Sequence, residues 1–206
     1  MNEGYNEVLR SIGSSDPTPG GGSVAALSLA HAHSLAMMVA RLTEGKKKWA
    51  EGHEVAQSVI SESQVGIAEA MRLAEIDAEA FDSVMVAYRL PRDTEDQKTE
   101  RTKSIRDATI GAAEVPLATA SGARKLLSSL EKLCVSCNAN ALTDLASASE
   151  LSLSAVKMAA MNVRINLEFI EGDDVDRLAS QISEVVHKST ASAEAITLKV
   201  NERLGW

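Results

Sequence analysis

The chain has 206 residues, of which 45% are hydrophobic, so one domain with a substantial core is the expected organisation. A formal net charge of −8 excludes a global basic field for nucleic acid, and 24% charged residues beside that apolar content exclude a disordered chain. Only 3% of the residues are aromatic whereas 31 are alanine, which favours helices packed closely through small side chains and argues against an all-β protein.

The N-terminal part of the chain predicts two helices joined by a loop. Residues 2–12 form a short amphipathic helix with their apolar side chains on one side. Residues 13–22 are a strong breaker segment, rich in glycine and proline. Ser23 is the expected N-cap of a helix rich in alanine, leucine and methionine that runs to about Thr43.

Two long helical regions follow, with apolar residues at helical spacing. The first covers residues 50–89 and ends at a Leu-Pro-Arg-Asp turn. Thr94 is the expected N-cap of the second, which runs to about Ala113. Pro116 then either kinks this helix or starts a new one that reaches about Ser136.

The last third of the chain predicts two more helices. Residues 138–144 lead into a helix that continues to Ile170, residues 172–174 form a turn and capping region, and a final helix covers residues 175–203. The sequence shows no strand pattern, no long repeat and no low-complexity linker. We therefore predict one all-α domain over residues 1–206, a bundle of long helices.

Three features of the sequence favour a cytoplasmic location. The sequence contains no run of about 18 residues that are all uncharged and apolar, so no membrane span is expected. The N-terminal residues lack the basic and apolar regions of a signal peptide. Two cysteines in a chain without an export signal are typical of a reducing compartment. We expect neither a membrane nor a nucleic-acid partner.

The segment from Pro17 to Ser23, Pro-Thr-Pro-Gly-Gly-Gly-Ser, is the most unusual in the chain. Consecutive glycines lower stability but let a backbone approach a ligand, and the first N–H groups of the following helix favour a negative or carbonyl-like group. A ligand-binding loop is the functional interpretation, with a flexible turn as the alternative. Its residues are Pro19, Gly20, Gly21, Gly22 and Ser23. The segment lacks the features of a P-loop and of a dinucleotide fingerprint.

A basic run, Lys46, Lys47 and Lys48, precedes Trp49 in an otherwise acidic chain. The helix dipole disfavours lysines at a helix N-terminus. One interpretation is therefore that the lysines bind an anionic ligand and that Trp49 offers a stacking face. The alternative is a solvated helix start.

Asn138, Asn140 and Asp144 form a polar cluster at a helix entrance, where capping is the alternative to a functional role. Asp144 also shares one helical stripe with Asn162 and Asn166. Asp144 and Asn162 are 18 residues apart, or roughly 27 Å along a straight helix. The two ends of the stripe therefore serve different roles, or different sites of an oligomer.

Asp77 interrupts an apolar stretch that continues to Phe81. The carboxylate of Asp77 is either at the edge of the surface or catalytic. No metal centre is expected. Cys134 and Cys137 form a C-x-x-C pair without the further ligands of a zinc site. The single E-x-x-H at residues 184–187 lacks the second copy that a di-iron bundle needs.

Several motifs occur in a fixed order: Pro-Thr-Pro-Gly-Gly-Gly-Ser-Val-Ala-Ala at 17–26, Met-Val-x-x-Leu-Thr-x-Gly-Lys-Lys-Lys at 38–48, Asp-Ala-Glu-Ala-Phe at 77–81, Leu-Pro-x-x-Thr at 90–94, Val-Pro-Leu at 115–117, Asn-x-Asn-x-x-Thr-Asp at 138–144 and Asn-Val-x-x-Asn-Leu at 162–167. Together, over about residues 5–170, they resemble the formiminotetrahydrofolate cyclodeaminase / methenyltetrahydrofolate cyclohydrolase family. The resemblance implies an all-helical, cytoplasmic enzyme of folate one-carbon metabolism, an obligate or near-obligate homodimer that needs no metal or other cofactor.

The resemblance also implies a tetrahydrofolate substrate, which can carry a polyglutamate tail. A chain without a formiminotransferase domain favours hydrolysis of 5,10-methenyltetrahydrofolate to 10-formyltetrahydrofolate, the cyclohydrolase reaction. The alternative is the cyclodeaminase reaction, from 5-formiminotetrahydrofolate to 5,10-methenyltetrahydrofolate and ammonia. A helical folate-binding scaffold without catalytic activity is a third alternative.

Both reactions pass through a tetrahedral carbon with shifting charge, which a carboxylate and hydrogen-bond donors can stabilise. Asp144 is the first candidate for that carboxylate and Asp77 the second, with Asn138 as an orienting amide. The glycine loop would hold the pterin.

The glutamate tail of the folate is expected to bind Lys46–Lys48, helped by Lys98 or Arg101. The chain departs from the family pattern at four side chains: Cys137 in place of Gly, Trp49 in place of Tyr, and His31 and His33 in place of small apolar residues. These departures bear on substrate preference more than on the fold.

Overall fold

The computed structural model describes residues 3–206, and the regular elements in that range are all helical. The α-helices are α1 (Glu3–Ile12), α2 (Gly21–Thr43), α3 (His53–Tyr88), α4 (Glu95–Ser136), α5 (Leu142–Leu167) and α6 (Asp173–Leu204). Two short 3₁₀ helices, η1 (Lys47–Gly52) and η2 (Ala139–Ala141), lie between them. The predicted all-α class is confirmed. Asn2, where the prediction starts the first helix, lies outside the described residues.

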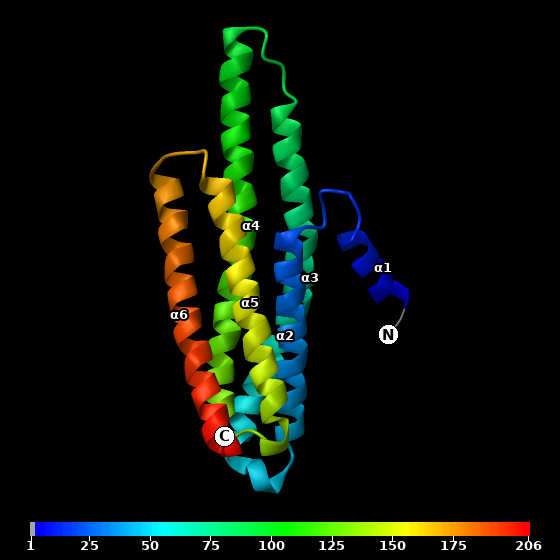
Figure 1. Ribbon diagram of the computed structural model, residues 1–206, viewed down its shortest axis with the longest axis vertical. Coiled ribbons are helices and arrows are strands. Elements are labelled where there is room, and N and C mark those ends of the chain that lie inside the picture. Colours follow the sequence, from blue (N-terminus) through cyan, green and yellow to red (C-terminus); the bar gives the residue numbers. More distant parts are fainter. Residues whose placement is uncertain (1–2) are drawn as a thin grey trace.

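The five long helices, α2 to α6, run alternately up and down beside one another, and α1 stands at one side of the bundle (Figure 1). Helices α3 and α4 extend beyond the ends of the others and form a hairpin arm, made of the end of α3, the start of α4 and the connection between Tyr88 and Glu95 (Figure 1). The start of α2 lies at the base of this arm. The end of α2 lies at the opposite end of the bundle, near the C-terminus (Figure 1).

Leucines of α4 and α5 and alanines of α2 make up much of the core. The largest fully buried side chains include Leu126, Leu127, Leu130, Leu133, Leu142 and Leu145. Helix α2 buries Ala25, Ala26, Ala30, Ala32, Ala36 and Ala40. Because alanine projects so little, α2 packs closely on both α3 and α5 along its length. The alanine-rich composition therefore serves close helix packing.

The expectation that no segment is long and apolar enough to span a membrane is corrected by helix α2. By length and composition it is apolar enough to cross a bilayer, since residues 21–40 carry no formal charge. In the structure it is packed between other helices, which bury 56% of its most apolar window. A core helix of a bundle has the same length and composition, so α2 is weak evidence for a span.

The start of α2 also differs from the prediction. The helix begins at Gly21, and Gly20 is an N-cap that makes no side-chain capping bond. Ser23 lies inside the first turn, and its hydroxyl donates to Asp77 Oδ2 at 3.0 Å. The prediction that Ser23 caps the helix is wrong, because a carboxylate of α3 is the partner of its hydroxyl.

Helix α4 continues through Pro116, so neither a break after Ala113 nor a new helix is present. Proline has no N–H, so the carbonyl of Ala112 loses its helical donor. The side chain of Asn166 in α5 replaces that donor, because its Nδ2 donates to Ala112 O at 2.8 Å. A contact from another helix thus makes the proline tolerable.

The remaining helix ends are close to their predicted positions. Thr94 caps α4 as expected: its Oγ1 accepts from the N–H of Gln97, and Gln97 Oε1 accepts from the N–H of Thr94, both at 3.2 Å. Helix α5 ends at Leu167, three residues before its predicted end. Gly172 has a φ of 134° and turns the chain into α6, which starts at Asp173.

Candidate active site

A cavity of about 360 Å³ lies where the glycine-rich loop meets α3, α4 and α5. We call it the glycine-loop cavity. It combines main chain from the loop with one carboxylate, two amides and an apolar wall. Its lining consists of Pro17, Thr18, Gly20, Gly21, Gly22, Asp77, Phe81, Val84, Ala112, Asn162, Ile165 and Asn166.

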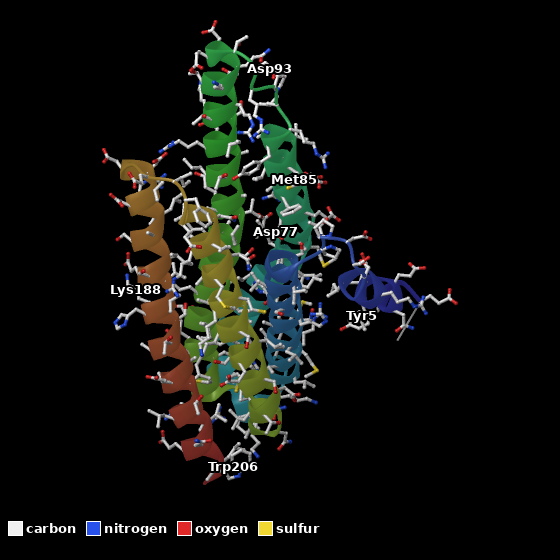
Figure 2. All side chains as sticks on the ribbon, turned by 45° about the horizontal axis from the view of Figure 1, so that its top comes forward. Tyr5, Asp77, Met85, Asp93, Lys188 and Trp206 are labelled. Carbon is white, nitrogen blue, oxygen red and sulfur yellow. The ribbon has the colours of Figure 1, made fainter. Side chains whose placement is uncertain are left out.

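Asp77 is the carboxylate of the glycine-loop cavity. Figure 2 shows it on α3 beside the start of α2, below the part of the arm that carries Met85. A Cβ atom on Gly22 would lie 2.1 Å from Asp77 Oδ1, so the glycine allows the carboxylate to reach the first turn of α2. Free N–H groups at a helix start favour an anion there.

Burial raises the pKa of Asp77 above its ordinary range, and the hydrogen bond from Ser23 opposes this rise. A half-buried carboxylate with a raised pKa is a better proton acceptor than an exposed one. Asp77 therefore has the position and the environment of an acid–base group.

Two amides of α5 line the same cavity and were not among the predicted site residues. Asn162 Nδ2 donates to Met158 O at 2.9 Å, and Asn166 Nδ2 donates to Ala112 O. A Cβ atom on Gly21 would lie 3.3 Å from Asn162 Nδ2, so the loop contacts this amide closely. Their spacing on one helical stripe was visible in the sequence, but the side of the bundle that the stripe faces was not.

The predicted lysines, Trp49, Asn138 and Asp144 gather at the opposite end of the bundle, which we call the lysine end: residues 46–49 and 138–144. Lys46, Lys47 and Lys48 are exposed. The ammonium of Lys48 lies 4.8 Å from the centre of the Trp49 ring. Trp49 thus presents an aromatic face among cations.

Asn138 has a structural role at the lysine end. Its N–H donates to Thr43 Oγ1 and its Nδ2 donates to Leu42 O, both at 3.0 Å, so it ties the turn before α5 to the end of α2. Its Oδ1 accepts from the N–H of Asn140 at 3.0 Å. Asp144 follows, half-buried, in the first turn of α5.

The glycine-loop cavity and the lysine end are separate within one chain. Gly22 and Thr43 lie at the two ends of α2, 21 residues apart, or roughly 30 Å along the helix. Asp77 and Asp144 therefore cannot act on one carbon atom within a single chain. The structure brings the glycine loop to Asp77, and it does not bring the lysines or Asn138 there.

Arg101 lies on the hairpin arm and is not among the residues that line the glycine-loop cavity. Its Nε and Nη2 donate to Tyr88 O at 3.3 and 3.1 Å, and its guanidinium lies over the Tyr88 ring. Lys98 is paired with Glu95 on the same arm. Arg101 is 11 residues from Ala112 of the cavity lining, or roughly 16 Å along α4. Its partner Tyr88 is four residues from Val84 of the lining, or about one helical turn along α3.

The unexplained histidines and cysteines lie outside the glycine-loop cavity. His33 is buried, and Gly66 leaves the space for its ring, because a Cβ there would lie 2.3 Å from His33 Nε2. Burial raises the pKa of the Cys134 thiol to about 11, so it is not a ready nucleophile. Within residues 3–206, His, Cys, Asp and Glu form no group of three that could hold a metal ion.

Comparison with known proteins places this geometry in a family. The family model described as formiminotransferase-cyclodeaminase matches residues 4–186. The chain belongs to the formiminotransferase-cyclodeaminase family. The family resemblance of the sequence motifs is thereby confirmed.

Relatives in this family carry both candidate activities in their names. The chain is 35% identical to a methenyltetrahydrofolate cyclohydrolase of Methylorubrum extorquens over 171 residues, 82% of each chain. It is 29% identical to the formimidoyltransferase-cyclodeaminase of Sus scrofa over 95% of its own length, but spans only 36% of that protein. A solved formiminotetrahydrofolate cyclodeaminase of Thermotoga maritima matches with a TM-score of 0.81 and 27% identity, covering 100% of this chain and 96% of that one.

Proposed function

We propose that the chain hydrolyses 5,10-methenyltetrahydrofolate to 10-formyltetrahydrofolate in the glycine-loop cavity. The observation that carries the proposal is Asp77, a half-buried carboxylate of α3 that faces the first turn of α2, in one cavity with two amides and the main chain of the glycine loop. Support also comes from the cyclohydrolase relative, which this chain matches over most of both lengths. The sequence ranked Asp144 first for the carboxylate. Asp77 is preferred in this proposal because it lines the cavity and accepts from Ser23, whereas Asp144 could reach that cavity only from a second copy.

The residues of the cavity fit each step of this hydrolysis. Asp77 accepts a proton from water as the water oxygen bonds to the cationic bridging carbon, which gives a neutral tetrahedral carbon. The bond from that carbon to N5 then breaks, and N5 takes the proton back from Asp77. The added hydroxyl loses its proton to solvent and becomes the formyl oxygen on N10. The amides of Asn162 and Asn166 are placed to orient the pterin and the water.

We further propose that two copies form an antiparallel homodimer. Exposed apolar side chains lie at opposite ends of two neighbouring helices: Met38 and Leu42 near the end of α2, and Met161 and Ile165 near the end of α5. A two-fold axis across the bundle pairs the one set with the other in an isologous interface. Ile165 also lines the glycine-loop cavity, so this face continues into the site.

In such a dimer the lysine end of one copy lies beside the glycine-loop cavity of the other. Lys46–Lys48 and Trp49 would then bind the anionic glutamate tail of a folate whose pterin sits in the neighbouring copy. Sedimentation should give twice the chain mass of 21.9 kDa; a stable monomer that is fully active would contradict the dimer.

We also propose that the protein is cytoplasmic, and the buried free thiols of Cys134 and Cys137 support this location.

The cyclodeaminase reaction is the second candidate, favoured by the match of the whole chain to a cyclodeaminase structure. An assay of both substrates separates the two. Decay of methenyl absorbance without ammonia release from 5-formiminotetrahydrofolate is the expected result, and ammonia release alone would favour the alternative. Folate binding without turnover of either compound would indicate a non-catalytic scaffold.

A further inference from the structure

Arg203 lies in the last turn of α6, beyond residues 4–186 that the family model matches. Its side chain crosses to the end of α4 and makes three hydrogen bonds there. We propose that Arg203 is a positioning residue, which holds the Asn138 turn and Trp49 in place for substrate. The proposal rests on the proposed function, because the lysine end is taken as part of the folate site.

The hydrogen bonds of Arg203 supply donors to carbonyls at the C-terminal end of α4. The last four carbonyls of a helix have no partner within the helix. Arg203 Nη1 donates to Cys134 O at 2.8 Å, and Nη2 donates to Cys137 O at 2.7 Å. Nη1 also contacts Cys137 Sγ at 3.3 Å. The planar fork of one guanidinium thus joins two carbonyls on either side of the helix end.

The carbonyl of Cys137 belongs to the peptide that leads directly into Asn138. Arg203 therefore fixes this turn from α6, while Thr43 and Leu42 fix it from α2. The 3₁₀ helix η1 closes the third side, because a Cβ on Gly52 would lie 2.6 Å from Ser136 O. The turn is held from three sides, and Arg203 is the charged contact among them.

Arg203 also connects the turn to Trp49. Its guanidinium carbon lies 5.9 Å from the centre of the Trp49 ring, which Lys48 contacts as well. Three of the four Nη hydrogens of Arg203 bond to main chain and sulfur. Arg203 therefore orders the ring and the turn, and the neighbouring lysines remain exposed to bind an anion.

The test compares Arg203→Lys and Arg203→Gln with Arg177→Gln. Arg177 is a control on the exposed face of the same helix, where it bonds to Gln181 one turn away. Lysine keeps the charge but cannot bridge two carbonyls in one plane. We expect kcat/KM to fall about tenfold in both Arg203 variants, because the turn and ring are misplaced. Arg203→Lys should keep a melting temperature close to that of the wild type, and Arg177→Gln should behave as the wild type.

Hydrogen exchange supplies a readout that does not depend on turnover. The N–H groups of Asn140 and Ala141 bond to Asn138, so their exchange should accelerate about tenfold in Arg203→Gln. Unchanged exchange there, or a wild-type kcat/KM in Arg203→Lys, would overturn the role of Arg203. If the wild-type protein turned over neither folate, the proposed function would be contradicted. The exchange rates of the Asn140 and Ala141 N–H groups would still test whether Arg203 holds the Asn138 turn in place.

Discussion

At Gly22 the backbone of α2 passes so close to Asp77 that a side chain would occupy the place of the carboxylate. Gly22→Ala should push the Asp77 carboxylate away from Ser23, because its Cβ would lie 2.1 Å from Oδ1. The carboxylate is the movable end of a side chain, so the fold should survive. We expect turnover to fall about 100-fold. The control is Gly111→Ala in α4, where an added Cβ meets nothing within 4 Å.

His33 predicts an acid-sensitive fold. Burial, assisted by Lys125, lowers the pKa of His33 from 6.5 to about 4. The unfolded chain therefore binds the proton more tightly, and stability from neutral His33 is complete above pH 6.5 and lost as the pH falls towards 4. The loss amounts to about 3 kcal/mol in the free energy of unfolding.

Urea unfolding between pH 7 and pH 4 measures this loss. His33→Leu should flatten the pH dependence in that window, whereas His187→Gln, at an exposed position of α6, should leave it as in the wild type. An equally steep fall in stability in His33→Leu would show that other groups carry the acid sensitivity.

At the scale of single residues, the sequence pointed to the glycine loop and to Asp77 but ranked Asp144 above it. Spacing along one helix cannot show which carboxylate a loop from another helix will face. The contacts of Gly22 and Ser23 with Asp77 span more than 50 residues of sequence, and they are the reason that we propose Asp77. Asn162 and Asn166 were missed for the same reason.

At the scale of the helices, Pro116 and Asn166 form a compensating pair. Asn166→Ala should lower the free energy of unfolding by about 1–2 kcal/mol, because Ala112 O is buried and loses its donor. In a Pro116→Ala background the restored N–H of residue 116 should bond to Ala112 O, so the same Asn166 change should cost much less. Equal costs in both backgrounds, measured by urea unfolding, would contradict the compensation.

Most helices could be predicted from local patterns, and Thr94 shows why: its capping box uses residues within one turn. Pro116 shows where local patterns fail. The two alternatives, a kink or a new helix at Pro116, followed from the missing N–H. The new helix is wrong, because α4 continues through Pro116, and only the fold shows that an amide from α5 supplies the bond. The N-cap assigned to Ser23 failed in the same way.

At the scale of the whole molecule, the separation of the glycine-loop cavity from the lysine end has a testable consequence. A variant with Asp77→Asn and a variant with Lys46, Lys47 and Lys48 changed to glutamine should each be nearly inactive. When the two are co-expressed in equal amounts, half of the dimers should be mixed, and each should contain one intact site. Activity should then recover to about a quarter of the wild-type rate.

If the co-expressed variants recovered no activity, the proposal that one site combines the cavity of one copy with the lysines of the other would be contradicted. The sequence anticipated that the two ends of the α5 stripe are too far apart for one site, because helix length follows from residue number. The helix predicted from Ser23 to about Thr43 implies a similar separation of the glycine loop from the lysines. The structure confirms this helix, because α2 is unbroken from Gly21 to Thr43.

The central claim is that folate chemistry takes place at Asp77, and single-turnover decay of 5,10-methenyltetrahydrofolate tests it most directly. Asp77→Asn should slow the decay at least about 100-fold, while Glu79→Gln, two residues away and exposed, should stay within about twofold of the wild type. Asp144→Asn tests the other carboxylate and should retain more activity than Asp77→Asn. A wild-type rate in Asp77→Asn together with an inactive Asp144→Asn would contradict the claim.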